Sequence, residues 1–292
     1  MKQEQTIQVP ARMNIPATSI YTEVYTQSGQ LGQRDALILM PGGPGNDHTV
    51  CDYSEHSFAE SILPYIDVIL FDPRDCGKSI KSPIEHCTMD EYINDVEAIR
   101  KHFQVPSNRT VIFGVSYGAI TALGYGVKYG AELKKLVVVC GAVTSGKFID
   151  DALQALSIIG TPAQQEMGKA ILTGCFNLSN DAAHYYQTMG PLYSTTFDPT
   201  LPTPSISYNL DLTNFGFRTF LREFDYAPKL SQIKCQTLII AADQDWIADL
   251  KQAEKVHQSI PDSQLIVYEN CGHMIWIDQW ERFLQDVIRF IQ

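Results

Sequence analysis

Long hydrophobic segments are absent from this sequence. No apolar run approaches the roughly 20 residues that a membrane-spanning helix needs. The first six residues, Met-Lys-Gln-Glu-Gln-Thr, are polar and lack the apolar core of a secretion signal. We therefore expect a protein that does not associate with membranes and that resides in the cytoplasm.

Basic residues and paired cysteines are also scarce. The 292 residues include 22 Lys and Arg against 33 Asp and Glu, which gives a formal net charge of −11. Binding to a phosphate backbone depends on clustered positive charge, so we expect no nucleic-acid partner. The seven cysteines show no C-x-x-C pair and no zinc-like spacing, so we expect free thiols and no metal site.

The sequence does contain a series of short apolar runs of strand length. They lie at Asp35–Met40, Ile66–Phe71, Thr110–Phe113, Leu133–Cys140, Gln236–Ala241 and Gln264–Tyr268. Nearly continuous apolar strands are typical of parallel sheets covered on both faces. Helical patterns separate these runs, so the sequence predicts an α/β fold with a doubly wound, mostly parallel sheet.

Three local patterns complete the predicted core. Ile7–Ile15 and Ser19–Thr26 predict an antiparallel pair of strands. Thr88–Phe103 has apolar residues spaced for one helix face, and Thr88 with Glu91 predicts a capping box at its start. A carboxyl-terminal amphipathic helix is expected at Gln279–Ile291.

Strand-like runs are absent from about Ala142 to Tyr226. Helical stretches such as Phe148–Ile159 and Ala163–Leu172 alternate there with loops rich in Pro, Thr and Tyr at 188–209. We interpret this region as an insertion that forms a largely helical cap. The predicted organisation is a core at 1–141, a cap at 142–228 and the rest of the core at 229–292.

Val111–Gly118 carries the chemical signature of the chain. It is an apolar run that ends in Gly-x-Ser-x-Gly, with Ser116 at its centre. In the nucleophile-elbow pattern a strand turns sharply into a helix and presents the serine Oγ above the sheet edge. A Cβ at position 114 or 118 would collide with the neighbouring strand or helix, and only glycine avoids this.

Two further loops follow predicted strands. Pro-Gly-Gly-Pro-Gly at 41–45 is an irregular loop with free backbone N–H groups, and the N–H of Gly43 is our candidate for one oxyanion-hole donor. We expect His48 to be a hydrogen-bonding residue of that loop. Asp72 and Arg74 lie after the next strand, and we expect them to brace the loops through an ion pair.

These motifs together resemble the α/β-hydrolase superfamily. They are Pro-Gly-Gly-Pro-Gly at 41–45, Asp-Pro-Arg-Asp-Cys-Gly-Lys-Ser at 72–79, Gly-Val-Ser-Tyr-Gly-Ala at 114–119 and Cys-Gly-His at 271–273. The likeness is greatest to the prolyl aminopeptidase (proline iminopeptidase) family, over about 30–141 and 229–292. That family has His and Gly where this chain has Pro41 and Asp75. The resemblance implies an α/β-hydrolase fold, release of an amino-terminal residue such as proline from short peptides, and no cofactor.

The partners of Ser116 follow from chain order. In this fold the acid and then the histidine come after the serine, each at the end of a later strand. His273 is the histidine in that position. Asp243 and Asp245 both follow the strand at 236–241, and the family register favours Asp245. We expect a covalent acyl-enzyme on Ser116, with the Gly43 and Tyr117 N–H groups stabilising the oxyanion.

Residues that contact the substrate are less well defined by the sequence. Family members that trim amino termini hold the α-ammonium with cap glutamates and, in some members, with an acid directly after the triad Asp. Trp246 occupies that position here, so Trp246, Glu223 and Phe215 are the candidates. Aromatic residues available for an apolar pocket are Tyr117, Phe148, Tyr185, Tyr186, Phe215 and Trp246.

Three functions stay open on the sequence alone. A peptidase requires acidic residues that face Ser116. An esterase or amidase on small apolar acyl groups requires no ammonium site. A non-catalytic ligand-binding protein on the same scaffold is the third alternative. The expected partner is a small molecule or short peptide, and the sequence predicts no oligomeric state.

Overall fold

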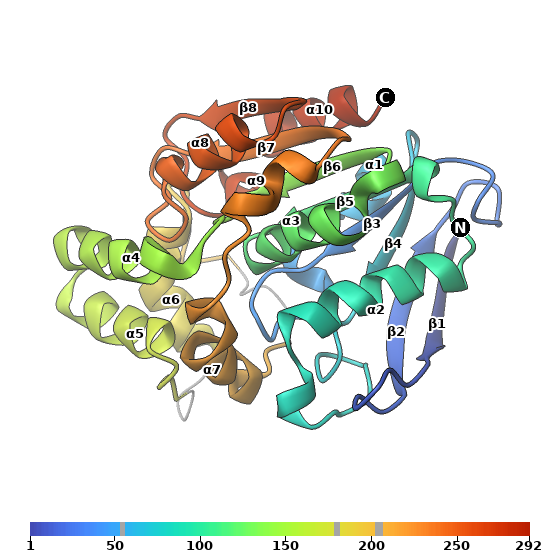
Figure 1. Cartoon of the computed structure of the whole chain (residues 1–292). Helices are drawn as coiled ribbons and strands as arrows, with labels where there is room; N and C mark the ends of the chain where they lie inside the picture. The colour runs from blue at the N-terminus through green and yellow to red at the C-terminus, as the bar shows by residue number, and fades with distance from the viewer. Residues whose placement is uncertain (53–55, 178–181, 202–206) are drawn as a thin grey trace.

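A computed structural model describes residues 1–52, 56–177, 182–201 and 207–292. These residues form an eight-stranded sheet with the order β1-β2-β4-β3-β5-β6-β7-β8 (Figure 1). The strands are β1 (Lys2–Val9), β2 (Thr18–Tyr25), β3 (Ala36–Met40), β4 (Asp67–Phe71), β5 (Thr110–Val115), β6 (Lys135–Val139), β7 (Gln236–Ala242) and β8 (Ser263–Tyr268). From β4 to β8 in the sheet order, neighbouring strands are parallel, as the apolar runs predict.

The predicted antiparallel pair is β1 and β2, at the sheet edge, with Lys2 opposite Tyr25 and Val9 opposite Thr18. The first strand begins and ends earlier than the predicted range of 7–15. Pro10 explains its end, because proline has no N–H to donate to the ladder. β2 also pairs antiparallel with β4 and so joins this edge to the parallel strands.

Side chains alternate between the two faces of the parallel strands, and each face has its own apolar core. Ile38 and Ile112 pack in one core with helices α2 (Met89–His102), α3 (Tyr117–Tyr129) and α8 (Leu250–Ser259). Leu37 and Phe113 pack in the other with α1 (Phe58–Ile62) and α10 (Trp280–Ile291). Covering both faces buries β3, β4 and β5 completely, which explains their continuous apolar sequences.

Helix α2 begins as predicted, although its capping box is incomplete. The Thr88 side chain accepts a hydrogen bond from the Glu91 N–H at 3.3 Å. The Glu91 carboxylate does not return the bond to Thr88 and instead accepts hydrogen bonds from Arg12 and Asn94. A long-range ion pair has replaced the local interaction that the sequence pattern suggested.

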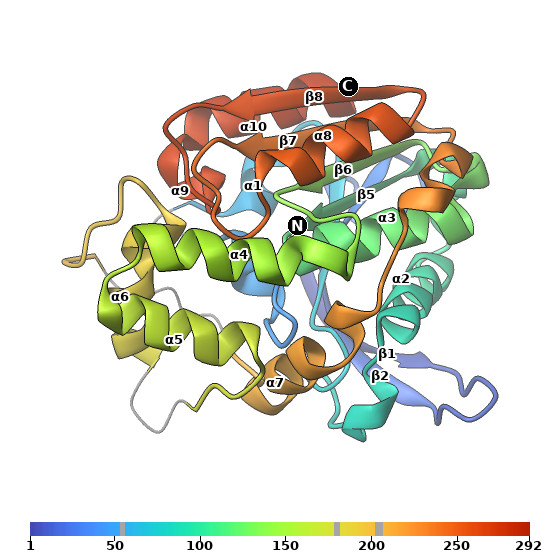
Figure 2. The ribbon, with the colours of Figure 1, turned by 60° about the vertical axis from the view of Figure 1, so that its left-hand side comes forward.

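The chain between β6 and β7 forms the helical region. Its α-helices among the described residues are α4 (Ser145–Ile159), α5 (Pro162–Leu172), α6 (Ala182–Tyr193) and α7 (Leu210–Arg218). Figure 2 shows α4 and α5 running side by side, apart from the sheet. The predicted loop at 188–209 differs in part, because 188–193 belongs to α6, and 202–206 lie outside the described residues. No helix formed by the described residues is long and apolar enough to cross a membrane.

Candidate active site

Ser116 lies at the turn between β5 and α3. Its backbone has φ 54° and ψ −120°, a conformation that residues with a Cβ rarely adopt. A Cβ on Gly114 would overlap the Gly118 carbonyl, and a Cβ on Gly118 would overlap the Met40 carbonyl at the end of β3. The two glycines therefore let the turn close against both the helix and the adjacent strand.

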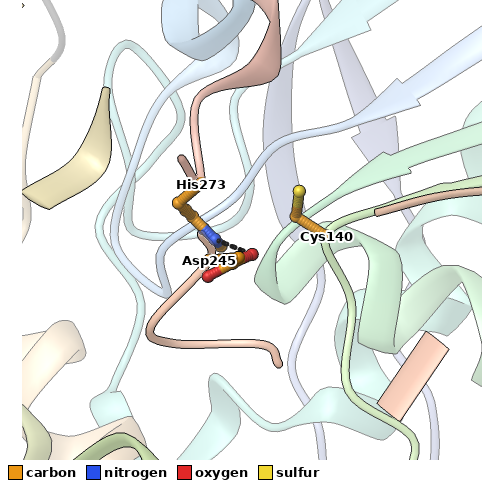
Figure 3. Close-up of side chains that lie close together, drawn as sticks. All are labelled: Cys140, Asp245 and His273. Carbon is orange, nitrogen blue, oxygen red and sulfur yellow. Dashed lines mark hydrogen bonds and ion pairs between the residues drawn. The ribbon is translucent and has the colours of Figure 1, made fainter. Parts of the chain in front are cut away.

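Ser116, His273 and Asp245 form a continuous chain of hydrogen bonds. His273 Nε2 lies 2.9 Å from Ser116 Oγ, and His273 Nδ1 lies 2.7 Å from Asp245 Oδ2. Figure 3 shows the Asp245 carboxylate directed at the imidazole. The other oxygen of Asp245 accepts hydrogen bonds from the N–H groups of Ile247 and Ala248, which fix its orientation. Asp245 and His273 are both about 5% exposed, so water competes little for these bonds.

Asp243 has a different place in the same loop. Its Oδ1 accepts a hydrogen bond from the Cys271 N–H at 3.2 Å. It therefore contacts the backbone of the loop that carries His273, whereas Asp245 contacts the imidazole. The geometry thus distinguishes the two carboxylates that the sequence left as alternatives, because Asp245 is hydrogen-bonded to His273 and Asp243 to the Cys271 N–H.

Cys140 approaches this group from the end of β6. Polar atoms of Cys140, Asp245 and His273 all lie within 4.8 Å of one another (Figure 3). Burial and the adjacent Asp245 charge raise the pKa of the Cys140 thiol well above its ordinary value, so it stays protonated at neutral pH. Sequence spacing gave no sign of this cluster, because its members come from three separate strand ends.

The two predicted oxyanion donors flank Ser116. The Tyr117 N–H is the first of α3, and the first N–H groups of a helix have no acceptor within the helix. Gly43 has φ +116°, and a Cβ added to its neighbour Gly42 would come within 3.3 Å of the Ser116 Cβ. Both Gly43 and Ser116 line the same cavity. The Tyr117 ring turns the other way and stacks on Tyr92, so it does not contribute to the predicted aromatic pocket.

A buried ionic network lies beside the Gly43 loop. His48 Nδ1 is 2.5 Å from Asp72 Oδ1, and His48 Nε2 is 3.1 Å from Glu23 Oε1 on β2. Burial opposes a charge on His48, but its hydrogen bonds to these two carboxylates outweigh burial and raise its pKa to about 9. His48 is thus the hydrogen-bonding residue that the sequence predicts, and it is positively charged at neutral pH.

The expected ion pair between Asp72 and Arg74 is wrong. Asp72 pairs with His48, and Arg74 donates two hydrogen bonds to Asp95 on α2. The two side chains leave the loop in different directions, toward His48 and toward α2. Nearby positions in a loop do not determine which way their side chains point. Asp72 and Arg74 each bond to a buried residue from elsewhere in the chain, His48 and Asp95.

A cavity of about 130 Å³ opens at Ser116 and His273. Three of the predicted aromatic residues line it: Trp246, Tyr185 and Tyr186. Sequence analysis missed five further aromatic residues of the wall, namely Phe176, Tyr193, Tyr208, Phe217 and Trp276. They come from separate segments of the helical region and from α9 (Ile275–Asp278), so no local pattern could have grouped them.

Three predicted substrate contacts lie outside this cavity. Glu223 is exposed, in the turn after the cap helices. Phe215 lies on α7 but packs against the buried cluster of Cys76, Cys87 and Leu212. Phe148 packs with Phe224 in the core between α4 and the sheet. Among the described residues that line the cavity, none is Asp, Glu, Lys or Arg.

The pattern of the alpha/beta hydrolase fold family matches residues 35–279. The chain belongs to this family. The match spans the elbow, the Gly43 loop, the whole helical insertion and His273. The family thus covers every segment that meets at the cavity.

Known relatives and solved structures align with most of this chain. It is 26% identical over 256 residues to the proline iminopeptidase PfmaB of Pestalotiopsis fici, covering 85% of this chain and 89% of the relative. An alpha/beta fold family hydrolase from Bacillus anthracis superposes with a TM-score of 0.79 at 16% identity, over 100% of both chains. An esterase from Exiguobacterium antarcticum superposes with a TM-score of 0.69 at 19% identity, over 94% and 96% of the two chains.

Proposed function

We propose that this hydrolase cleaves an ester or amide bond through an acyl-enzyme on Ser116. The observation that carries this proposal is the hydrogen-bonded chain from Asp245 through His273 to Ser116, at the mouth of an aromatic cavity. The strained backbone of Ser116 supports a nucleophilic role, since sparsely populated conformations cluster at functional sites.

The reaction follows from these positions. Ser116 Oγ attacks the carbonyl carbon of the substrate while His273 Nε2 takes the hydroxyl proton. The carbonyl oxygen becomes an oxyanion, and the N–H groups of Gly43 and Tyr117 stabilise it, each by about 3 to 4 kcal/mol. His273 then gives its proton to the leaving amine or alkoxide, and Asp245 stabilises the imidazolium throughout. Water attacks the acyl-enzyme by the same route, which releases the acid and restores Ser116.

The acyl group should be compact and apolar, and an amino-terminal prolyl residue is one candidate. The chain's relative PfmaB is named a proline iminopeptidase. Aromatic walls suit a small ring. The faces of Tyr and Trp attract a cation, so they offer an ammonium group some compensation where the described wall residues include no carboxylate.

An uncharged acyl group is the second candidate. It is favoured by the lack of any Asp or Glu among the described residues of the cavity wall. A free ammonium buried there would lose its hydration without a carboxylate partner. The superposed esterase provides a structural parallel, although that likeness concerns the fold.

Three chromogenic substrates separate these candidates: proline anilide with a free amine, the same anilide with a blocked amine, and a short acyl ester. Turnover of the free-amine anilide alone would support an iminopeptidase. Turnover of the ester and the blocked anilide would support a neutral acyl group. Ser116→Ala should abolish every activity, together with covalent labelling by a fluorophosphonate. Activity that survives in this variant would contradict the serine mechanism.

A further inference from the structure

The loop that carries His273 is bonded to the cap segment 194–196 through one carboxylate, that of Asp278. Asp278 Oδ2 accepts hydrogen bonds from the Gly272 N–H at 2.7 Å and the Thr195 N–H at 3.2 Å. Its Oδ1 accepts a bond from the Ser194 hydroxyl at 2.6 Å. Thr196 adds two more to Oδ1, from its N–H at 3.1 Å and its hydroxyl at 3.0 Å. Oδ2 therefore joins the two segments, and Oδ1 holds the cap segment in place beside it.

Direct contacts reinforce this connection on either side of His273. The Met274 N–H donates to the Tyr193 carbonyl at 2.8 Å. Gly272 lies against the same carbonyl, since a Cβ at this glycine would come within 2.5 Å of the Tyr193 oxygen. The Thr195 hydroxyl donates to the Asn270 carbonyl at 2.7 Å. Because both chain neighbours of His273 contact Tyr193, the backbone position of His273 depends on the end of cap helix α6.

A second carboxylate holds the same loop from the opposite side. Asp243, after β7, accepts from the Cys271 N–H, and the Gln244 N–H donates to the Cys271 carbonyl at 3.0 Å. The loop at 271–274 is thus held between the sheet, through Asp243, and the cap, through Asp278. Asp243 and Asp278 accept hydrogen bonds from the Cys271 and Gly272 N–H groups of this loop, so each acts on the backbone that carries His273.

We propose that Asp278 is a positioning residue for His273. It fixes the histidine loop against cap segment 194–196 and so sets the imidazole between Asp245 and Ser116. This inference rests on the proposed function, and it makes the cap a part of the catalytic apparatus as well as the wall of the cavity. Positioning matters at this scale, because a misplacement of about 1 Å can cost about 100-fold in rate.

Asp278→Asn is the direct test. The amide keeps one acceptor oxygen but presents an NH₂ group in place of the other, so the backbone N–H groups that face the NH₂ group lose their acceptor. We expect the rate constant for fluorophosphonate labelling of Ser116 to fall by about 100-fold. The low-field proton resonance of the hydrogen bond between His273 and Asp245 should shift or broaden, which a change in stability alone would not produce.

Asp198→Asn is the matched control. Asp198 is exposed, lies two residues beyond the cap segment 194–196, and accepts hydrogen bonds from the N–H and hydroxyl of Thr200. In the Asp198→Asn protein, Ser116 should be labelled by the fluorophosphonate at the wild-type rate. Ser194→Ala removes the shortest hydrogen bond to Asp278 and replaces Asp278→Asn in the test if that variant does not fold. We expect a smaller decrease in the labelling rate of Ser116, with the same change in the proton resonance.

The outcomes separate the two proposals. Folded Asp278→Asn and Ser194→Ala proteins with wild-type labelling rates and an unchanged resonance would overturn the positioning role. A wild-type protein that is not labelled at all would contradict the proposed function, and the resonance would then decide the role of Asp278 by itself.

Discussion

The sheet and the helical cap contribute to one site in different ways. At the sheet, backbone contacts hold the reacting groups, as in the turn of Ser116, where carbonyl oxygens of β3 and α3 leave no space for a Cβ at Gly114 or Gly118. At the cap, side chains such as Tyr186 and Phe217 form the wall of the cavity. Changes in the sheet loops should therefore affect the reaction itself, and changes in cap side chains that only line the cavity, such as Phe217, should affect the choice of substrate.

The largest expected effect separates two carboxylates that lie after the same strand. Asp245→Asn should lower kcat by about 10⁴-fold, because the amide no longer supports the imidazole in the required tautomer. Asp243→Asn keeps an acceptor for the Cys271 N–H and should retain most of the activity. Steady-state kinetics on the best substrate of the panel checks both. Comparable losses in the two variants would contradict the assignment of Asp245.

The second prediction concerns the backbone of the elbow. Gly118→Ala places a Cβ on the Met40 carbonyl, and because backbone must move we expect a loss of more than about 3 kcal/mol in the free energy of unfolding. Gly130→Ala is the control, since a Cβ there meets nothing within 4 Å and φ is −79°. It should be neutral or stabilising by up to about 1 kcal/mol. Urea unfolding measures both, and equal stabilities would refute the steric argument.

The third prediction uses the charge of His48. A pKa raised from 6.5 to about 9 corresponds to about 3 kcal/mol of stability. Because the folded-state pKa is the higher one, this contribution is complete below about pH 6.5 and is lost as the pH rises through about 9. The cost of His48→Gln in the free energy of unfolding should therefore shrink by about 3 kcal/mol between about pH 6 and pH 10.

The control for His48 is the same substitution at His257, an exposed histidine on α8 that contacts Ser263. Its cost should stay small across this range. Chemical denaturation at several pH values makes the comparison. A cost of His48→Gln that does not vary with pH would show that folding does not raise the pKa of His48.

The smallest expected effect belongs to the cap wall. Phe217 and Phe215 lie on the same helix, but only Phe217 lines the cavity. Phe217→Leu enlarges the cavity and should shift the ratio of kcat/KM between a larger and a smaller acyl substrate by about 10-fold, the usual scale for apolar pockets. Phe215→Leu should leave this ratio unchanged. A shift of equal size in both variants would mean that α7 acts through its position and not through its side chains.

Local patterns in the sequence were enough to predict most of the sheet. Each parallel strand is a short apolar run because both of its faces are buried, and this property is visible without knowledge of the neighbours. The elbow was predictable because its Gly-x-Ser-x-Gly pattern is continuous in the chain, although the clash that excludes a Cβ at Gly118 is with Met40 of β3. The strand order was not predictable from such runs, because pairing joins segments distant in the chain.

The sequence by itself determined the elements, the turn at Ser116 and the order in which the serine, the acid and the histidine occur. Only the tertiary structure decided that Asp245 and not Asp243 contacts His273, that Asp72 pairs with His48, and that Phe217 faces the cavity while Phe215 does not. The physical reason is the range of the interactions. Apolar strands and the elbow motif are continuous stretches of the chain and can be seen in the sequence, whereas side-chain direction is set by partners that folding brings from elsewhere in the chain.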